Sequence, residues 1–321
     1  MSDPSPDRRP SALTLAHRLV HLEPPSLGRL EVEDRTAVLP EQARAWWRAM
    51  GFPEVGDEEA VFGEADLVMV RRLRDLVDSG AIGDDDILRL ARLMGASFSR
   101  LVDAQLDTIE EMLTTAFPDE SPRQVWNHLD DVTIGDAGVL DFLQDAMVYV
   151  WRRHLLAELG QRLDVAGDTP EETVGFADLT GFSRLSKELS RAELAEIIDT
   201  FEATAFDVVS THEARVVKLI GDEVMFVTDD VDTAVAVCIE LITRLGEIEN
   251  MPPVHCGIGS GPTVEVGGDV FGPTVNLAAR LTGVARPGTV AVPRDVGAHL
   301  LERDDLDVRR VRRIYDLKGV G

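Results

Sequence analysis

The spacing of apolar residues changes near the middle of the chain, and this change limits the fold more than any other feature. Before residue 165, apolar residues recur at spacings of three and four, which is typical of amphipathic helices. The predicted helices there cover residues 11–21, 40–50, 64–79, 84–94, 96–117 and 137–163. After the loop 165–170, short apolar runs of strand length alternate with helical segments. The sequence therefore predicts an all-α region followed by an α+β domain.

The second half of the chain predicts one specific order of strands and helices. Its predicted strands are 173–179, 214–221, 223–228, 254–261, 289–293 and a terminal strand within 308–319. Its predicted helices are 181–212, 230–248, 273–285 and 294–302, and a hairpin arm covers 263–271. This β-α-β-β-α-β order predicts a ferredoxin-like core with helices on one face of a mostly antiparallel sheet. We therefore divide the chain into a helical domain (1–138), a linker helix (139–164) and an α+β domain (165–321).

Composition excludes several classes of partner. The 321 residues include 58 acidic and 32 basic side chains, for a net charge of −26, and such a surface repels nucleic acid and anionic membranes. No apolar run approaches the roughly 20 residues of a membrane span, and the first residues lack the apolar stretch of a signal peptide. Cys238 and Cys256 are the only cysteines, so no disulfide framework is expected. We expect a cytoplasmic protein without a nucleic-acid partner or membrane insertion.

One segment of the helical region allows a different interpretation. Residues 46–62, with Trp46, Trp47 and Phe62, weakly resemble winged helix-turn-helix repressors, which would make the chain a DNA-binding regulator. The simpler interpretation is a helical core anchored by two tryptophans. We favour the core, because the region is net acidic and acidic surfaces bind phosphates poorly.

Two acids stand where predicted strands end. Asp178 closes the strand 173–179, and Asp222 lies on the tight turn between the strands 214–221 and 223–228. Paired carboxylates at one edge of a sheet would hold hard divalent cations through oxygen ligands, as two-metal phosphoryl chemistry requires. Exposed backbone N–H groups next to Asp178 would bind phosphate, and they belong to Leu179, Thr180, Gly181 and Phe182. The alternative is that Asp178 is only a helix cap and Asp222 only a turn residue.

Four further polar residues stand out in the second half. Lys218 lies inside an otherwise apolar strand, where an edge position would be the simple explanation. Asp269 follows a Gly-Gly pair, and Asn276 and Arg280 stand four residues apart, so they share one helical face. An amide and a guanidinium there could orient a ribose and neutralise charge on a phosphoryl group, although a solvated helix face would also explain Arg280.

Three segments together resemble the catalytic domain of class III nucleotidyl cyclases, over about residues 170–321. They are Phe176–Ser183, Lys218–Phe226 and Gly268–Arg280. The resemblance implies that Asp178 and Asp222 bind two Mg²⁺ or Mn²⁺ ions per active site, and that Lys218 and Asp269 read adenine. It also implies that Asn276 places the ribose and that Arg280 stabilises the transition state at the α-phosphate. Lys318 corresponds to the phosphate-contacting region of the family.

The resemblance implies an adenylyl cyclase that converts ATP to 3′,5′-cyclic AMP and pyrophosphate. A lysine can donate to a ring nitrogen of adenine, and a carboxylate can accept from its 6-amino group. Alternatives are a guanylyl cyclase, which places other residue types at the two base-reading positions, and a catalytically silent nucleotide-sensing module. His212 and His255 lie outside the three motifs, and we expect them to have packing or surface roles.

The family resemblance also bears on assembly and regulation. It implies a homodimer with active sites at the interface, where Asp178 and Asp222 come from one protomer and the other four motif residues from its partner. The first half is similar to the helical regulatory domains that precede cyclase domains in some actinobacterial enzymes. That similarity implies modulation by an unidentified small-molecule, lipid or pH signal through the linker helix, where His154 would be the residue to test for pH control.

Overall fold

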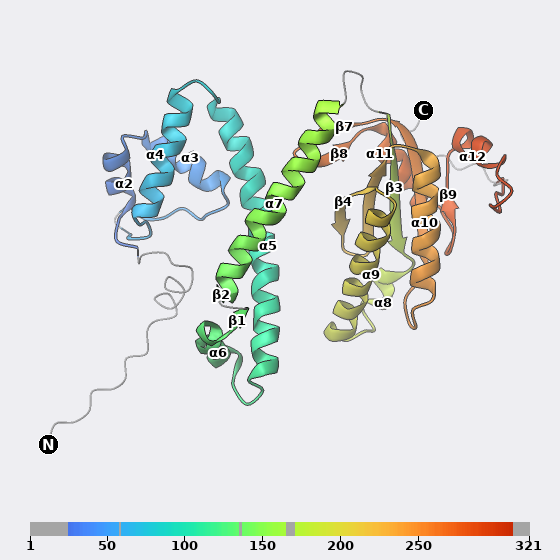
Figure 1. Ribbon diagram of the computed structural model, residues 1–321, viewed down its shortest axis with the longest axis horizontal. Coiled ribbons are helices and arrows are strands. Elements are labelled where there is room, and N and C mark those ends of the chain that lie inside the picture. The colour runs from blue at the N-terminus through green and yellow to red at the C-terminus, as the bar shows by residue number, and fades with distance from the viewer. Residues whose placement is uncertain (1–24, 58, 135–136, 165–170, 311–321) are drawn as a thin grey trace. The chain divides into compact units, whose positions relative to one another are not determined.

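A computed structural model describes residues 25–57, 59–134, 137–164 and 171–310 (Figure 1). The chain forms two compact units, residues 1–164 and 165–321. The predicted helix 11–21 and Lys318 lie outside the described residues. Within the described ranges, no helix combines the length and the apolar character needed to cross a membrane.

The first unit is helical, as the sequence predicts. Its elements in order are α2 (Arg29–Thr36), α3 (Pro40–Ala49), α4 (Glu64–Asp78), α5 (Asp84–Ala116), α6 (Pro122–Val125), the 3₁₀ helix η1 (Trp126–Asp131), the small hairpin β1 (Thr133–Ile134) and β2 (Ala137–Gly138), and α7 (Val139–Asp164). The two tryptophans do anchor its core: Trp46 is 2% exposed, and Trp47 packs beside Phe62. The short elements α2, α6, η1 and the hairpin were not predicted.

The predicted break between 94 and 96 is wrong, because α5 continues through Gly95 for 33 residues. A Cβ atom at Gly95 would lie 2.3 Å from the carbonyl oxygen of Met50, at the end of α3. Glycine is therefore required at this position by close packing between α3 and α5, not by a break in the helix.

The second unit is built around a five-stranded sheet. Its strands are β3 (Glu171–Leu179), β4 (Arg215–Ile220), β5 (Glu223–Thr228), β6 (Val254–Pro262) and β9 (Val290–Ala291), in the order β4-β5-β3-β6-β9. All neighbours are antiparallel except β6 and β9. The helices are α8 (Phe182–Leu185), α9 (Arg191–Thr211), α10 (Val231–Gly246), α11 (Pro273–Thr282) and α12 (Arg294–Leu300), and a separate hairpin pairs β7 (Val264–Val266) with β8 (Asp269–Phe271). The predicted α+β, ferredoxin-like core is confirmed.

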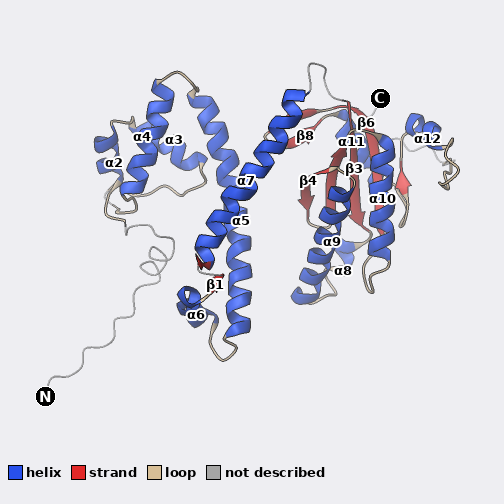
Figure 2. Cartoon of the chain, in the orientation of Figure 1, coloured by secondary structure: helices blue, strands red, loops and turns tan. Residues whose placement is uncertain are grey.

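Helices cover both faces of this sheet, so the prediction of a single helical face is wrong for α11. Side chains alternate between the two faces of a strand. Ala177 and Leu179 join a core with residues of α9 and α10, on what we call the α9/α10 face. Val174 and Phe176 join a smaller core with Ala278 of α11, on the α11 face. Figure 2 shows α9 and α10 next to each other along the strands.

Two boundaries in this unit differ from the sequence prediction. The helical stretch 181–212 is divided into α8 and α9 by Ser190, whose hydroxyl accepts from the backbone N–H of Glu193 in a capping box. The predicted terminal strand within 308–319 is not formed at 308–310, and the rest of it lies outside the described residues.

Candidate active site

Asp178 and Asp222 meet at the end of the sheet where β3 ends and the β4–β5 turn lies. The backbone N–H of Leu179 donates to the carbonyl of Asp222 at 3.1 Å, which joins the two segments. The turn has two residues: Gly221 has a φ of +65°, and Asp222 is not among the residues with a positive φ. Only the first central residue therefore has a positive φ, which is the pattern of a type II′ turn. Asp178 also lies directly opposite Glu223 in the β3–β5 ladder. Three carboxyl groups therefore gather in one place.

Crowding and burial change how these acids titrate. Burial raises the pKa of Asp222, and the charge of Asp178 raises it further, while His255 acts in the opposite direction. Burial and the charges of Asp178 and Asp222 raise the pKa of Glu223 to about 7. The cluster therefore holds more negative charge than its surroundings compensate, which a bound cation would relieve.

These residues fit a divalent-cation site that is completed by a substrate. Among the residues that the structure describes, no group of three or more His, Cys, Asp or Glu side chains is arranged to hold a metal ion. Mg²⁺ is commonly bound through only one or two carboxylates, with waters and substrate phosphates as its other ligands. Asp178 and Asp222 supply that donor set, and burial together with the nearby charge of Asp178 raises the pKa of Asp222.

The segment 179–182 differs from the predicted phosphate cradle. The N–H groups of Leu179 and Thr180 already donate to the carbonyls of Asp222 and Pro253, at 3.1 and 2.8 Å. The prediction of four exposed N–H groups is therefore wrong for these two residues. Gly181, at the start of α8 with a φ of +74°, and Phe182 remain as backbone donors. The buried hydroxyl oxygen of Thr180 has no hydrogen-bond partner in the described part of the chain.

Lys218 reaches the face of α11 because of a β-bulge. Val216 pairs with Phe226, but Lys218 pairs with Met225, so Val217 is an extra residue in β4. The bulge reverses the alternation, so that Leu219 enters the core on the α9/α10 face and Lys218 shares the face of Met225. The Nζ atom of Lys218 lies 2.8 and 2.7 Å from the two carboxylate oxygens of Asp269 on β8. The structure thus brings together Lys218 and Asp269, which lie 51 positions apart in the sequence.

Asn276 and Arg280 lie on the outer side of α11. The residues of α11 that turn toward the sheet include Thr274, Ala278 and Thr282, which are all buried. Asn276 falls between two of these positions in sequence, on the opposite side of the helix, and it is exposed. Arg280, four residues further, shares its side and is half-buried.

His255 contacts the cluster of acids at the sheet end, although nothing in the amino-acid sequence predicted this position. It lies directly opposite Asp178 in the β3–β6 ladder, and its Nε2 is 2.9 Å from Asp178 Oδ2. His255 therefore contacts Asp178, a contact that the sequence did not predict. His212, by contrast, pairs with Glu240 at 2.8 Å, on α9 and α10. The contact between His255 and Asp178 could be predicted only from the pairing register of β3 and β6, which the sequence alone does not give.

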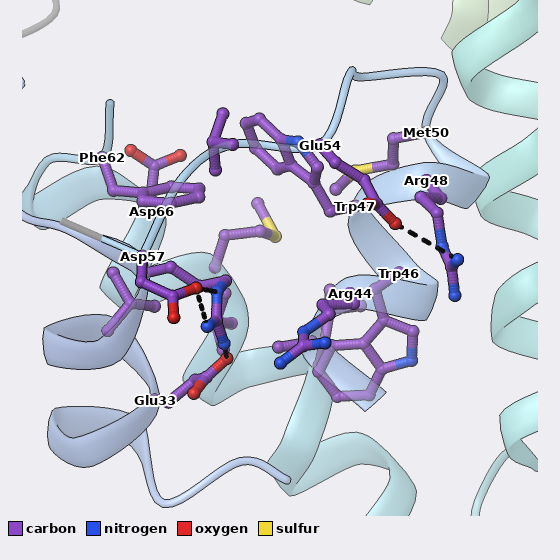
Figure 3. A pocket seen from close by; sticks show the side chains of 17 residues that line it. Glu33, Arg44, Trp46, Trp47, Arg48, Met50, Glu54, Asp57, Phe62 and Asp66 are labelled. Atoms are coloured by element: carbon purple, nitrogen blue, oxygen red, sulfur yellow. Dashed lines mark hydrogen bonds and ion pairs between the residues drawn. The ribbon is translucent and has the colours of Figure 1, made fainter. Parts of the chain in front are cut away.

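The first unit contains a cavity of about 190 Å³ among α2, α3 and α4 (Figure 3). Its wall is largely apolar and includes Trp46, Trp47 and Phe62. Arg29, at its edge, is paired with Glu33 and Asp57. This volume is below the about 300–1,000 Å³ that is usual for ligand sites, so it suits only a small molecule or a few waters.

Comparison with known proteins identifies the family of the chain. Residues 165–321 match the family described as the adenylate and guanylate cyclase catalytic domain. An adenylate cyclase from Streptomyces coelicolor is 38% identical over 270 residues, covering 83% of this chain and 69% of the relative. One from Glutamicibacter nicotianae is 30% identical over 314 residues, covering 91% of this chain and 76% of the relative. The guanylyl cyclase domain of a fusion protein from the fungus Blastocladiella emersonii has a TM-score of 0.40 and 20% identity, over 42% of this chain and 87% of that one.

The second unit, a ferredoxin-like α+β domain with paired acids at the end of its central strands, has the architecture of a nucleotidyl cyclase catalytic domain. With the identity and coverage of its relatives, the chain belongs to the adenylate and guanylate cyclase family, the class III nucleotidyl cyclases.

Proposed function

We propose that the chain is an adenylyl cyclase that converts ATP to 3′,5′-cyclic AMP and pyrophosphate. The observation that carries this proposal is the pair formed by Lys218 and Asp269, with Nζ 2.7 Å from the nearer carboxylate oxygen. A lysine can donate to a ring nitrogen of adenine, and an aspartate can accept from its 6-amino group. Guanine presents a carbonyl oxygen at position 6, which a carboxylate cannot bind, so the same pair disfavours GTP.

Each of the remaining residues has a separate role in the reaction. Asn276 orients the ribose so that its 3′-oxygen faces the α-phosphorus. The 3′-hydroxyl releases its proton to solvent, the new P–O bond forms, and the bond between the α-phosphorus and pyrophosphate breaks. Arg280 neutralises the charge that develops on the α-phosphoryl oxygens. The N–H groups of Gly181 and Phe182 contact the triphosphate, and Lys318, outside the described residues, is the further contact that the family resemblance implies.

Asp178 and Asp222 would hold the two Mg²⁺ or Mn²⁺ ions. When bound, the cations lower the pKa of the ribose 3′-hydroxyl and offset the charge of the triphosphate. The support for this assignment is the closeness of the two carboxylates: burial raises the pKa of Asp222, and the charge of Asp178 raises it further.

The active form would be a homodimer with two composite sites. Asn276 is exposed on the side of α11 that faces away from its own sheet, and Arg280 shares that side. Side chains on the outer surface can serve a site that is completed by a second copy, and a two-fold axis then makes two equal sites. Asp178 and Asp222 of one protomer would face Lys218, Asp269, Asn276 and Arg280 of the other.

The first unit would modulate the rate in response to a small-molecule, lipid or pH signal. Beyond its first turns, α7 exposes large apolar side chains, among them Tyr149 (65% exposed), Trp151 (63%) and Leu156 (62%). Such a surface is typical of a helix that packs against something else in the assembly, as a linker helix would. A protein that begins at residue 165 keeps the proposed chemical residues, and we expect its rate to differ from that of the full chain, most plainly by an increase. Equal rates of the two proteins across a range of pH and of lipid or metabolite additions would count against modulation.

The activity is tested by incubating the purified full-length protein with Mn²⁺ and either ATP or GTP, and measuring both cyclic nucleotides. We expect cyclic AMP from ATP and little cyclic GMP from GTP, in a cytoplasmic enzyme. Asp222→Asn serves as the inactive control. Binding of ATP without turnover would favour a silent nucleotide-sensing module, and a higher rate with GTP would favour a guanylyl cyclase.

A further inference from the structure

His255 is held in one position by contacts on both sides of its ring. Its Nε2 lies 2.9 Å from Asp178 Oδ2, and its Nδ1 lies 3.3 Å from the carbonyl oxygen of Ala285, which follows α11. Its side chain is 14% exposed, compared with 32% for that of Asp178. The ring therefore lies between an oxygen on each side, which restricts its rotation.

The contact with His255 uses only one oxygen of Asp178. Rotation of a carboxylate about its terminal torsion is broad and nearly two-fold, so an aspartate without a partner would present either oxygen in many orientations. The contact of Oδ2 with His255 restrains the rotation of this carboxylate. The orientation is thus restrained before a cation arrives.

We propose that His255 is a positioning residue that fixes the carboxylate of Asp178 for the divalent cation of the cyclase reaction. The inference rests on the proposed function, since it takes Asp178 to be a cation ligand. His255 also lies on the same face of the sheet as Glu223, because both stand opposite Asp178 in their ladders. Residues that hold metal ligands in this way typically change metal affinity or activity by about 10–100-fold.

The chain offers a matched control for this contact. His212 Nε2 lies 2.8 Å from Glu240 Oε2, and its side chain is 25% exposed. It is the same type of pair in the same unit, but it joins α9 and α10 and includes none of the acids at the sheet end. Removing it tests the general cost of losing a histidine–carboxylate pair.

The test measures Mn²⁺ binding directly. Mn²⁺ alone is titrated into full-length protein, and the free ion is followed by electron paramagnetic resonance. We expect His255→Ala to raise the dissociation constant by at least about 10-fold. His255→Gln keeps a donor near the position of Nε2 and should recover most of the affinity, and His212→Ala should bind like the wild type. A second readout is cyclic AMP synthesis against Mn²⁺ concentration at saturating ATP, where excess Mn²⁺ should restore the rate of His255→Ala.

Two results would overturn the inference while leaving the proposed function intact. One is an active wild type in which His255→Ala matches its Mn²⁺ affinity and Mn²⁺ dependence. The other is an equal loss in His255→Ala and His255→Gln that excess Mn²⁺ does not restore, which would mean a purely structural role. If the wild type itself neither binds Mn²⁺ nor makes cyclic AMP, the proposed function fails, and this inference fails with it.

Discussion

Gly257 on β6 is the position where the smallest substitution should have the largest effect on the active site. A Cβ atom there would lie 2.2 Å from the backbone nitrogen of Thr282 and 2.4 Å from the carbonyl oxygen of Ala278. Both atoms belong to the backbone of α11, so no flexible side chain can move aside. To reach an ordinary contact of 3.4 Å, α11 would have to move by 3.4 − 2.2 = 1.2 Å.

The expected magnitude for Gly257→Ala follows from that displacement. Overpacking of a core usually costs about 1–3 kcal/mol, and we expect the upper end, because the clash is between backbone segments. For a unit of this size, about 3 kcal/mol lowers Tm by roughly 6–12 °C. α11 carries Asn276 and Arg280, and misplacing such groups by about 1 Å can cost about 100-fold in rate. We therefore expect a cyclase rate at least 10-fold below the wild type in the fraction that remains folded.

Two other glycines complete the series. At Gly259 the nearest atom is the carbonyl oxygen of Thr274 at 2.8 Å, so Gly259→Ala should have a smaller effect of the same kind. Gly246, at the end of α10, has nothing within 4 Å of its Cβ position, so Gly246→Ala is the matched control and should change neither quantity. Thermal unfolding by circular dichroism and the initial rate of cyclic AMP synthesis measure both effects. A Gly257→Ala protein with wild-type Tm and rate would refute the close packing of α11 on β6.

Three further predictions concern the charged residues of the site. The double variant Lys218→Glu, Asp269→Cys should turn over ATP about 10-fold more slowly or worse, since buried polar groups left unpaired cost about 1–3 kcal/mol each. An unchanged ratio of ATP to GTP rates would contradict the role of these two residues in binding adenine. The variants Asp222→Ala and Arg280→Ala should each be inactive alone. After subunit exchange half of the dimers are mixed and each mixed dimer has one intact site, so about a quarter of the wild-type rate should return. If no activity returns despite demonstrated exchange, each site lies within one chain or the two sites are coupled. The pKa of Glu223 is raised to about 7 in the folded protein, so its contribution to stability is present at low pH and lost as the pH rises through about 7. Without divalent cations, Glu223→Gln should therefore be more stable than the wild type at pH 8 by about 1–2 kcal/mol, after allowance for partial exposure, and equal to it near pH 4.5; urea unfolding at both values decides.

The order of elements in the second unit could be predicted because its strands and helices differ in apolar spacing and are separated by clear turns. The hairpin at Gly221 and Asp222 is an example, since a Gly-Asp pair between two apolar runs indicates a two-residue turn. The division at Ser190 could also have been found, because Ser190 and Glu193 have the spacing of a capping box. The continuity of α5 could not, since the contact that Gly95 makes with Met50 is not visible in the sequence.

The candidate site was only partly predictable, and the reason is strand register. The closeness of Asp178 and Asp222 follows from the topology, since β5 lies next to β3. The position of Lys218 depends on a bulge at Val217, which a run of apolar residues does not reveal. His255 depends on a pairing between strands 77 positions apart, and a shift of one residue would turn it to the other face.

The same register explains why the site lies at this end of the sheet. Asp178 on β3 lies directly opposite Glu223 on β5 and His255 on β6. One face of these three neighbouring strands therefore ends in two acids and a histidine, and Asp222 lies on the adjoining turn. The preceding pairs on that face are Phe176 with Met225 and Phe176 with Gly257, which are apolar. Burial raises the pKa of Glu223 and of Asp222, so the charged forms of these acids are unfavourable at this end of the sheet. Unfavourable local charge of this kind is expected at functional sites, where a ligand can compensate it. A divalent cation held by Asp178 and Asp222 would reduce this unfavourable charge.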